Sequence, residues 1–150
     1  MTDYKEEIFI QLYSEHSAWS RHQESQRANI SNLILTMTAM GIALIGYDDV
    51  IEKSDLPFSV FILLLGFFGL VFIHKYYVQF KYHDSRVEAY KSMLNESLES
   101  TDILKIEKES DRKAKENHKL FTKIRVNYIW IAIHSLISLA GLILTILALS

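Results

Sequence analysis

Three long runs of apolar residues alternate with polar stretches along this chain of 150 residues. They cover residues 28–47, 56–73 and 126–150, and none of them contains Lys, Arg, Asp or Glu. As a helix rising ~1.5 Å per residue, each is about long enough to cross a hydrocarbon layer ~30 Å thick. The pattern therefore predicts an all-α fold with three transmembrane helices.

The polar stretch 1–27 predicts an amphipathic helix, because Tyr4, Ile8 and Leu12 fall near one helical face. No Pro or Gly interrupts it, so we expect it to run straight into the first transmembrane helix. The stretch 48–55 predicts a short acidic outer loop between the first two transmembrane helices.

The long polar stretch 74–125 predicts a charged cytoplasmic helical hairpin. Apolar and aromatic residues extend the second helix beyond the membrane at spacings of four and three, typical of a packed seam. They are Tyr76, Phe80, His83, Val87, Tyr90 and Leu94. We expect this helix to reach about residue 99, a turn at 100–102, and a second helix over 103–125 that continues into the third transmembrane helix. The second arm has a weak seam, so we expect the first arm to pack on the N-terminal helix or on another subunit.

The distribution of positive charge predicts the orientation of the chain. Of the 16 Lys and Arg residues, only Lys53 lies between the first two apolar runs, and none follows the third run. Lys and Arg concentrate on the cytoplasmic side of membrane proteins. We therefore expect the N-terminus inside, the C-terminus outside, and membrane lipid as a partner.

Small and polar residues form one stripe in each apolar run at helical spacing. The stripes contain Asn29, Asn32, Thr36, Ala39, Ala43 and Gly46 in the first run, Ser59, Gly66 and Gly69 in the second, and His134, Ser138, Gly141, Thr145 and Ala148 in the third. Such stripes let membrane helices pack closely. In an oligomer, one stripe could instead line a water-filled path.

We interpret the polar members as candidates for lining or gating a pore, and the small members as helix-packing residues. The pore candidates are Asn29, Asn32, Thr36, His134, Ser138 and Thr145, and the packing candidates are Ala39, Ala43, Gly66, Gly69 and Gly141. His134 is either a hydrogen-bonded structural histidine or a gating or proton-sensing group, because an ionisable residue inside a membrane is costly.

The sequence offers no recognisable catalytic chemistry. It has no cysteine and none of the motifs of phosphate-binding loops, zinc proteases or serine hydrolases. We therefore expect no enzyme, no cofactor and no metal.

Basic residues alternate with aromatic ones after the second apolar run, in a pattern that binds nucleotides or single strands or, more simply, faces lipid headgroups. The candidate contacts for a cytosolic protein, nucleotide or nucleic-acid trigger are Lys75, Lys81, Arg86, Lys91 and Tyr90.

The segment 19–46 resembles small bacterial inner-membrane proteins of the RipA type. The resemblance rests on Trp19-Ser-Arg21, on Gln26-Arg27-Ala28-Asn29, and on the first apolar run with Asn32, Thr36 and Thr38. It implies a homo-oligomer, described as an octamer in that family, in the bacterial inner membrane. It also places Arg27, Ala28 and Asn29 at the cytoplasmic entrance of the first transmembrane helix. The architecture is similar to that of membrane effectors of antiphage systems.

Two hypotheses follow. The first is a gated pore or ion channel, plausibly an antiphage defence effector that depolarises the membrane after a cytoplasmic trigger. The second is a non-conducting membrane anchor or adaptor that docks a cytosolic partner through its hairpin.

Overall fold

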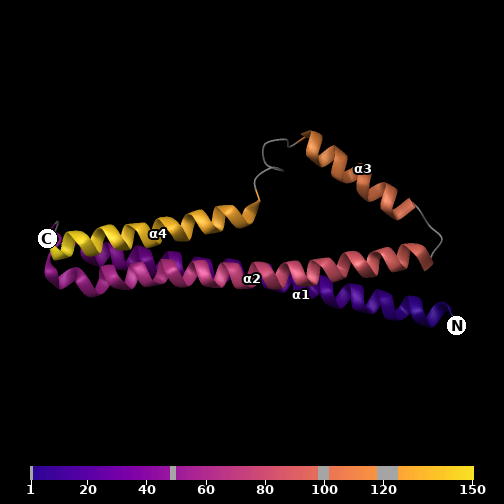
Figure 1. Cartoon of the computed structure of the whole chain (residues 1–150), viewed down its shortest axis with the longest axis horizontal. Coiled ribbons are helices and arrows are strands. Elements are labelled where there is room, and N and C mark those ends of the chain that lie inside the picture. Colours follow the sequence, from indigo (N-terminus) through magenta and orange to yellow (C-terminus); the bar gives the residue numbers. More distant parts are fainter. Residues whose placement is uncertain (1, 48–49, 98–101, 118–124) are drawn as a thin grey trace. The chain divides into compact units, whose positions relative to one another are not determined.

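The computed structural model describes residues 2–47, 50–97, 102–117 and 125–150, and these contain helices and no strand. The four α-helices in Figure 1 are α1 (Thr2–Ile45), α2 (Leu56–Ser97), α3 (Asp102–Asn117) and α4 (Val126–Leu149), with a short 3-10 helix at Lys53–Asp55 before α2. Three of them, α1, α2 and α4, are long and apolar enough to cross a membrane. The expected all-helical class is confirmed, together with the three apolar helices.

The start of α2 follows from local hydrogen bonds. The backbone N–H of Glu52 donates to Asp55 Oδ2 at 3.0 Å, and the N–H of Asp55 donates to the Glu52 carbonyl, also at 3.0 Å. Pro57 is the second residue of α2, where its missing N–H costs no helical hydrogen bond. The rest of the predicted acidic loop includes residues 48–49, which lie outside the described residues.

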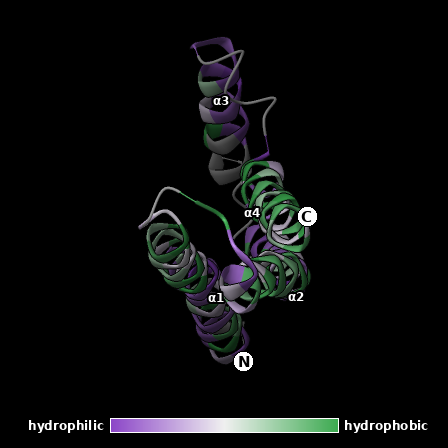
Figure 2. Cartoon of the chain, turned by 90° about the vertical axis from the view of Figure 1, so that its left-hand side faces the viewer, coloured by the Kyte–Doolittle hydropathy of each residue, from purple (hydrophilic) through white to green (hydrophobic). Residues whose placement is uncertain are grey.

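The described chain divides into two compact units. One comprises Met1–Glu24 and Tyr77–Arg125, and the other comprises Ser25–Tyr76 and Val126–Ser150. We call them the polar unit and the apolar unit. The hydropathy colours of Figure 2 show this difference along the helices, because hydrophobic residues cover α4 and hydrophilic ones dominate α3.

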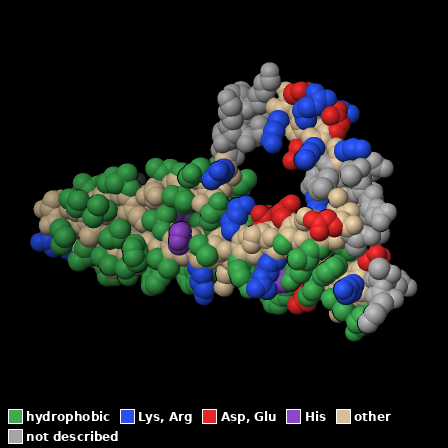
Figure 3. Space-filling view, turned by 45° about the vertical axis from the view of Figure 1, so that its right-hand side comes forward, with side chains coloured by type: hydrophobic (Ala, Val, Ile, Leu, Met, Phe, Trp, Pro, Cys, Tyr) green, Lys and Arg blue, Asp and Glu red, His purple; other side chains and the backbone are tan. Residues whose placement is uncertain are grey.

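In the apolar unit, α1, α2 and α4 pack around a small core. Its members come from all three helices: Ile34, Ile45, Ile62 and Ile137, with Ile30, Leu65, Ile133 and Leu144 against them. The outward faces carry exposed Leu, Ile and Phe side chains, seen in green in Figure 3. Exposed apolar surface of this extent suits lipid rather than water.

In the polar unit, the first part of α1 packs against the last part of α2. His16 and Trp19 of α1 contact His83 of α2, and the ring of His16 stacks on Tyr90. His83 and Tyr90 belong to the predicted seam, so the expectation that this arm packs on the N-terminal helix is confirmed for these contacts.

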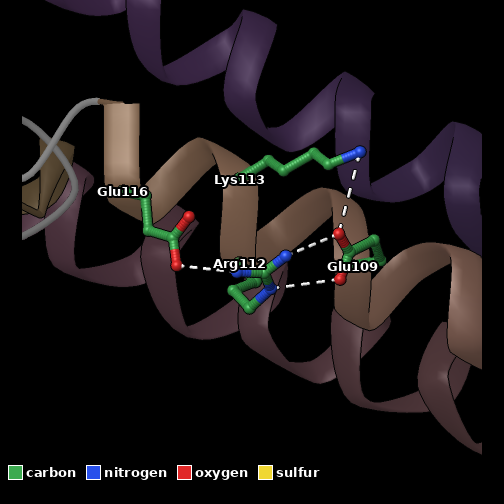
Figure 4. Close-up of polar contacts among 4 residues, drawn as sticks. All are labelled: Glu109, Arg112, Lys113 and Glu116. Carbon is green, nitrogen blue, oxygen red and sulfur yellow. Dashed lines mark hydrogen bonds and ion pairs between the residues drawn. The ribbon is translucent and has the colours of Figure 1, made fainter.

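The predicted return arm differs from what the sequence indicated. The single helix expected over 103–125 is α3 only as far as Asn117, and Arg125 lies outside any helix. Residues 98–101 and 118–124, which include the first two residues of the predicted turn, lie outside the described residues, and its third residue, Asp102, begins α3. Every described side chain of α3 from residue 108 to 117 is exposed, so α3 buries no face in this region and a packed hairpin stays a prediction. The helix is instead stabilised by pairs along its own surface, as Figure 4 shows for Arg112, Glu109 and Glu116.

Candidate functional site

The polar stripe of α1 lies on the outside of the apolar unit. Asn29, Asn32 and Thr36 are exposed, and so are Ala39 and Ala43. The hydroxyl of Thr36 donates to the Asn32 carbonyl at 2.9 Å, which satisfies it within the helix. Ala39 and Ala43 are therefore not buried against other helices of the described chain, and their role in helix packing stays a prediction.

The side of α1 that packs inward is a second stripe, which is not among the predicted stripes. Its members recur at spacings of four and three and are buried: Arg27, Ser31, Ile34, Thr38, Gly41 and Ile45. Arg27, predicted at the entrance of the first transmembrane helix, is only 5% exposed. The sequence contains this second stripe as well, because Ser31, Thr38 and Gly41 are small or polar, like the members of the predicted stripe.

His134 lies at the centre of the apolar unit. Its side chain is fully buried, and its Nε2 atom is 3.2 Å from Ser31 Oγ. The imidazole ring lies directly against Gly69 of α2, where an added Cβ would come within 2.6 Å of ring carbons. His134 thus pairs with Ser31 of α1, whereas Asn29 and Asn32 lie on the exposed side of that helix.

The other two polar candidates on α4 also lie in helix contacts. Ser138 is half-buried and faces Gly66 of α2, while the Thr145 hydroxyl donates to the Gly141 carbonyl of its own helix at 2.7 Å. In the single chain, His134, Ser138 and Thr145 therefore belong to the inward face of α4. Their role in a pore stays a prediction, because within the chain α4 presents His134 and Ser138 to Gly69 and Gly66 of α2.

Gly66 and Gly141 mark the closest approach of α2 and α4. A Cβ at Gly66 would lie 2.8 Å from Ser138 Cα, and one at Gly141 would lie 2.6 Å from Leu63 Cα. Both distances are below any normal carbon contact, so only glycine allows the two backbones to approach this far. These two positions and Gly69 lie where the packing interpretation placed them.

Two of the basic residues proposed to contact a cytosolic trigger, Lys81 and Arg86, contact neighbouring side chains of α2. Lys81 pairs with Asp84 at 2.9 Å and lies over the ring of Phe80, and the guanidinium of Arg86 lies 4.3 Å from the ring centre of Tyr82. Contacts of this exposed kind are weak and exchange easily.

The remaining trigger candidates differ in exposure. Lys75 is exposed, whereas Lys91 and Tyr90 are half-buried, and Tyr90 stacks on His16. The candidates therefore do not form one open basic face.

Within the described ranges, no group of three His, Cys, Asp or Glu side chains is placed to hold a metal ion. Comparison with models of protein families, with curated proteins and with solved structures gives no match to this chain. The resemblance to proteins of the RipA type therefore stays a prediction.

Proposed function

We propose that this chain is a three-span protein of the bacterial inner membrane, with its N-terminus inside, whose copies assemble around a gated pore lined by α1. Three features support the topology: the three apolar helices, their exposed apolar faces, and the confinement of all Lys and Arg except Lys53 to one side. The observation that carries the pore is the exposed polar stripe with Asn29, Asn32 and Thr36.

An amide that faces lipid without a partner is costly. Transfer of such a group from water to a hydrocarbon costs about 4–8 kcal/mol when nothing can hydrogen-bond to it. Asn32 lies four residues into the apolar run that begins at Ala28, so its carboxamide favours water or another polar helix over lipid. Assembly of several copies with this stripe inward provides both.

The pore has to form between copies. Ile34, Ile62 and His134 are buried between the helices of one apolar unit, and three helices are too few to enclose a pore. The lining is therefore reduced to Asn29, Asn32 and Thr36, with His134, Ser138 and Thr145 supporting the helices behind it.

The polar unit suggests that the protein is regulated from the cytoplasm. The polar unit contains the basic and aromatic residues of α2 from Tyr77 onward and the charged helix α3. A cytosolic protein, nucleotide or nucleic acid that binds there could change the packing of α1 and open the pore. Depolarisation of the membrane in response to such a signal is the behaviour of an antiphage defence effector.

Ion flux through liposomes tests the pore. We expect purified protein to pass ions, and Asn32→Leu to lower the flux at least about tenfold, equivalent to about 1.4 kcal/mol in the barrier. Asn32→Gln, which keeps the carboxamide, should retain flux, and Leu35→Ala, at an exposed apolar position, should leave it unchanged. An oligomer that excludes ions under every trigger tried, including membrane potential, would disprove the pore.

The alternative is a non-conducting anchor or adaptor, and the exposure of α3 favours it. The face of this helix seen in Figure 3 carries both basic and acidic side chains, and its described side chains from residue 108 to 117 are exposed. Under this alternative, reversing the charges of Lys113 and Lys115 abolishes function, whereas Asn32→Leu leaves it intact. Under the pore hypothesis Asn32→Leu is inactive, so the charge-reversal variant and Asn32→Leu together distinguish the two functions.

A further inference from the structure

Two histidines from different helices meet in the polar unit. The Nδ1 atoms of His16 in α1 and His83 in α2 are 2.9 Å apart, which is hydrogen-bond distance, and their ring centres are 5.2 Å apart. They are separated by 67 positions in sequence, and the sequence analysis did not pair them. The contact joins the N-terminal part of α1 to the distal part of α2.

Aromatic side chains enclose the pair. Tyr90 stacks on the ring of His16 with centres 5.6 Å apart, and Trp19 stacks on His83 with centres 6.0 Å apart. Tyr82 lies edge-on to His83 at 5.3 Å. His16 is 9% exposed, so little water reaches its side of the contact.

A bond between two Nδ1 atoms requires one donor and one acceptor. Two neutral imidazoles satisfy this requirement when one carries its proton on Nδ1, and so does one imidazolium beside one imidazole. When both rings are protonated, two N–H groups and two positive charges face each other at 2.9 Å. That state has no hydrogen bond and strong repulsion.

The charges around the pair act in opposite directions. Partial burial, then the charges of His16 and Arg86, hold the pKa of His83 below its ordinary value, and the carboxylate of Glu15 partly opposes them. His22 lies beyond Trp19, edge-on to its indole at 5.7 Å, and adds positive charge on the α1 side when protonated. The lowered pKa of His83 means that the separated state binds protons more readily than the packed state. The contact is therefore at full strength above about pH 6.5 and weakens as the pH falls through that value.

We propose that His16 and His83 form a pH-operated latch, which holds the N-terminal part of α1 on α2 while at most one ring is protonated and releases it when both are. The latch stands on the contact itself and does not depend on whether the protein conducts ions.

A bridging metal ion is the competing explanation for two converging nitrogens. Stable zinc sites take at least three protein ligands, and no group of three metal-binding side chains is found in the described part of the chain. The contact distance and the stacked aromatic rings suit a hydrogen bond directly. A proton is therefore the ligand that the geometry favours.

The chain contains no cysteine, so a distance across the latch can be measured cleanly. Spin labels on Gln11→Cys and Ser92→Cys, both exposed positions, report the separation of α1 and α2 in the polar unit. In full-length protein in detergent, we expect a short, narrow distance at about pH 8 and a longer, broader one at about pH 5, with the midpoint below about pH 6.5. A distance that does not change with pH overturns the latch.

Three variants and one chelator complete the test. His16→Asn and His83→Asn each place a hydrogen-bonding group near the Nδ1 position without its titration, so each should abolish the pH response. His22→Asn removes a neighbouring histidine outside the contact and should keep it. Either latch variant responding like the parent, or the control losing its response, overturns the proposal. An opening caused by EDTA at about pH 8 also overturns it and assigns the two nitrogens to a metal.

Discussion

Adding one methyl group where α2 and α4 touch should destabilise the apolar unit. A Cβ on Gly141 would lie 2.6 Å from Leu63 Cα and 2.9 Å from the carbonyl carbon of Ile62. Carbon atoms pack favourably at about 3.5–4.0 Å, so Gly141→Ala requires the two backbones to separate by about 1 Å. No rotamer change can relieve the overlap, because the atoms in contact belong to the backbone.

The magnitude follows from three terms, of which the second opposes the other two. Overpacking costs about 1–3 kcal/mol, and replacing a helical Gly by Ala returns up to about 1 kcal/mol through helix propensity. Separation of α4 from α2 also weakens the contact of His134 with Ser31, worth about 1 kcal/mol as a hydrogen bond. We therefore expect a net loss of about 2 kcal/mol for Gly141→Ala and a similar loss for Gly66→Ala.

The other glycines supply matched controls for the same chemical change. A Cβ at Gly41 would lie 3.2 Å from side-chain carbons of Ile62, which can turn aside, and one at Gly46 would lie 3.4 Å from the Ile42 carbonyl oxygen. Both alanine variants should be within about 0.5 kcal/mol of the parent protein. The alanine variants should therefore differ in stability according to the atoms that each added methyl group would contact.

Unfolding by SDS in mixed micelles measures these differences, with Trp130 fluorescence as the signal in a Trp19→Phe background. The double variant Gly66→Ala with Gly141→Ala should lose less than the sum of the single losses, because one separation of α2 from α4 accommodates both methyls. If Gly141→Ala is as stable as Gly41→Ala, then the two backbones do not approach as described and the argument is refuted.

Three further predictions concern buried and exposed polar groups, each checked by the same SDS titration. Ser31→Ala should cost about 1–3 kcal/mol by leaving the buried Nε2 of His134 without its partner, and adding His134→Leu should cost less than the sum; an additive pair would show that the two side chains do not interact. Thr38→Val should be neutral or stabilising by up to about 1 kcal/mol, since the buried Thr38 hydroxyl has no hydrogen-bond partner among the described residues; a clear loss would reveal a partner. Arg112→Ala should leave the SDS midpoint unchanged, because its pairs with Glu109 and Glu116 lie on an exposed surface of α3.

The elements that could be predicted from the sequence are those set by composition over many residues. Long uncharged runs specify apolar helices, and the run that begins at residue 56 matches the start of α2 to the residue. The continuation of α2 beyond that run was also predictable, since the seam with His83 and Tyr90 persists at helical spacing. The end of α3 at Asn117 was not, because no Pro or Gly follows it to mark a boundary.

The choice of face on α1 could not be made from spacing. Two stripes run along this helix, one with Asn32 and one with Ser31, and both repeat at three and four positions. Which stripe turns inward depends on the space that α2 leaves, and Gly69 leaves room for the ring of His134, which then reaches Ser31. The choice of the inward face therefore depends on how three helices distant in sequence pack together, and the periodicity of α1 alone does not determine it.

Because α1 has one packed face and one exposed face, mutations can test its roles in the fold and in ion flux separately. Substitutions at Ser31 or Thr38 act on the packed interior, so a loss of function there reports only a loss of structure. Asn32 is exposed, so Asn32→Leu should leave the folded monomer intact. A loss of ion flux in that variant, with an unchanged SDS midpoint, would therefore report on what faces the stripe in the membrane. Because lipid would favour leucine over asparagine at this position, a variant that is both stable and inactive requires water or a polar neighbour at the stripe.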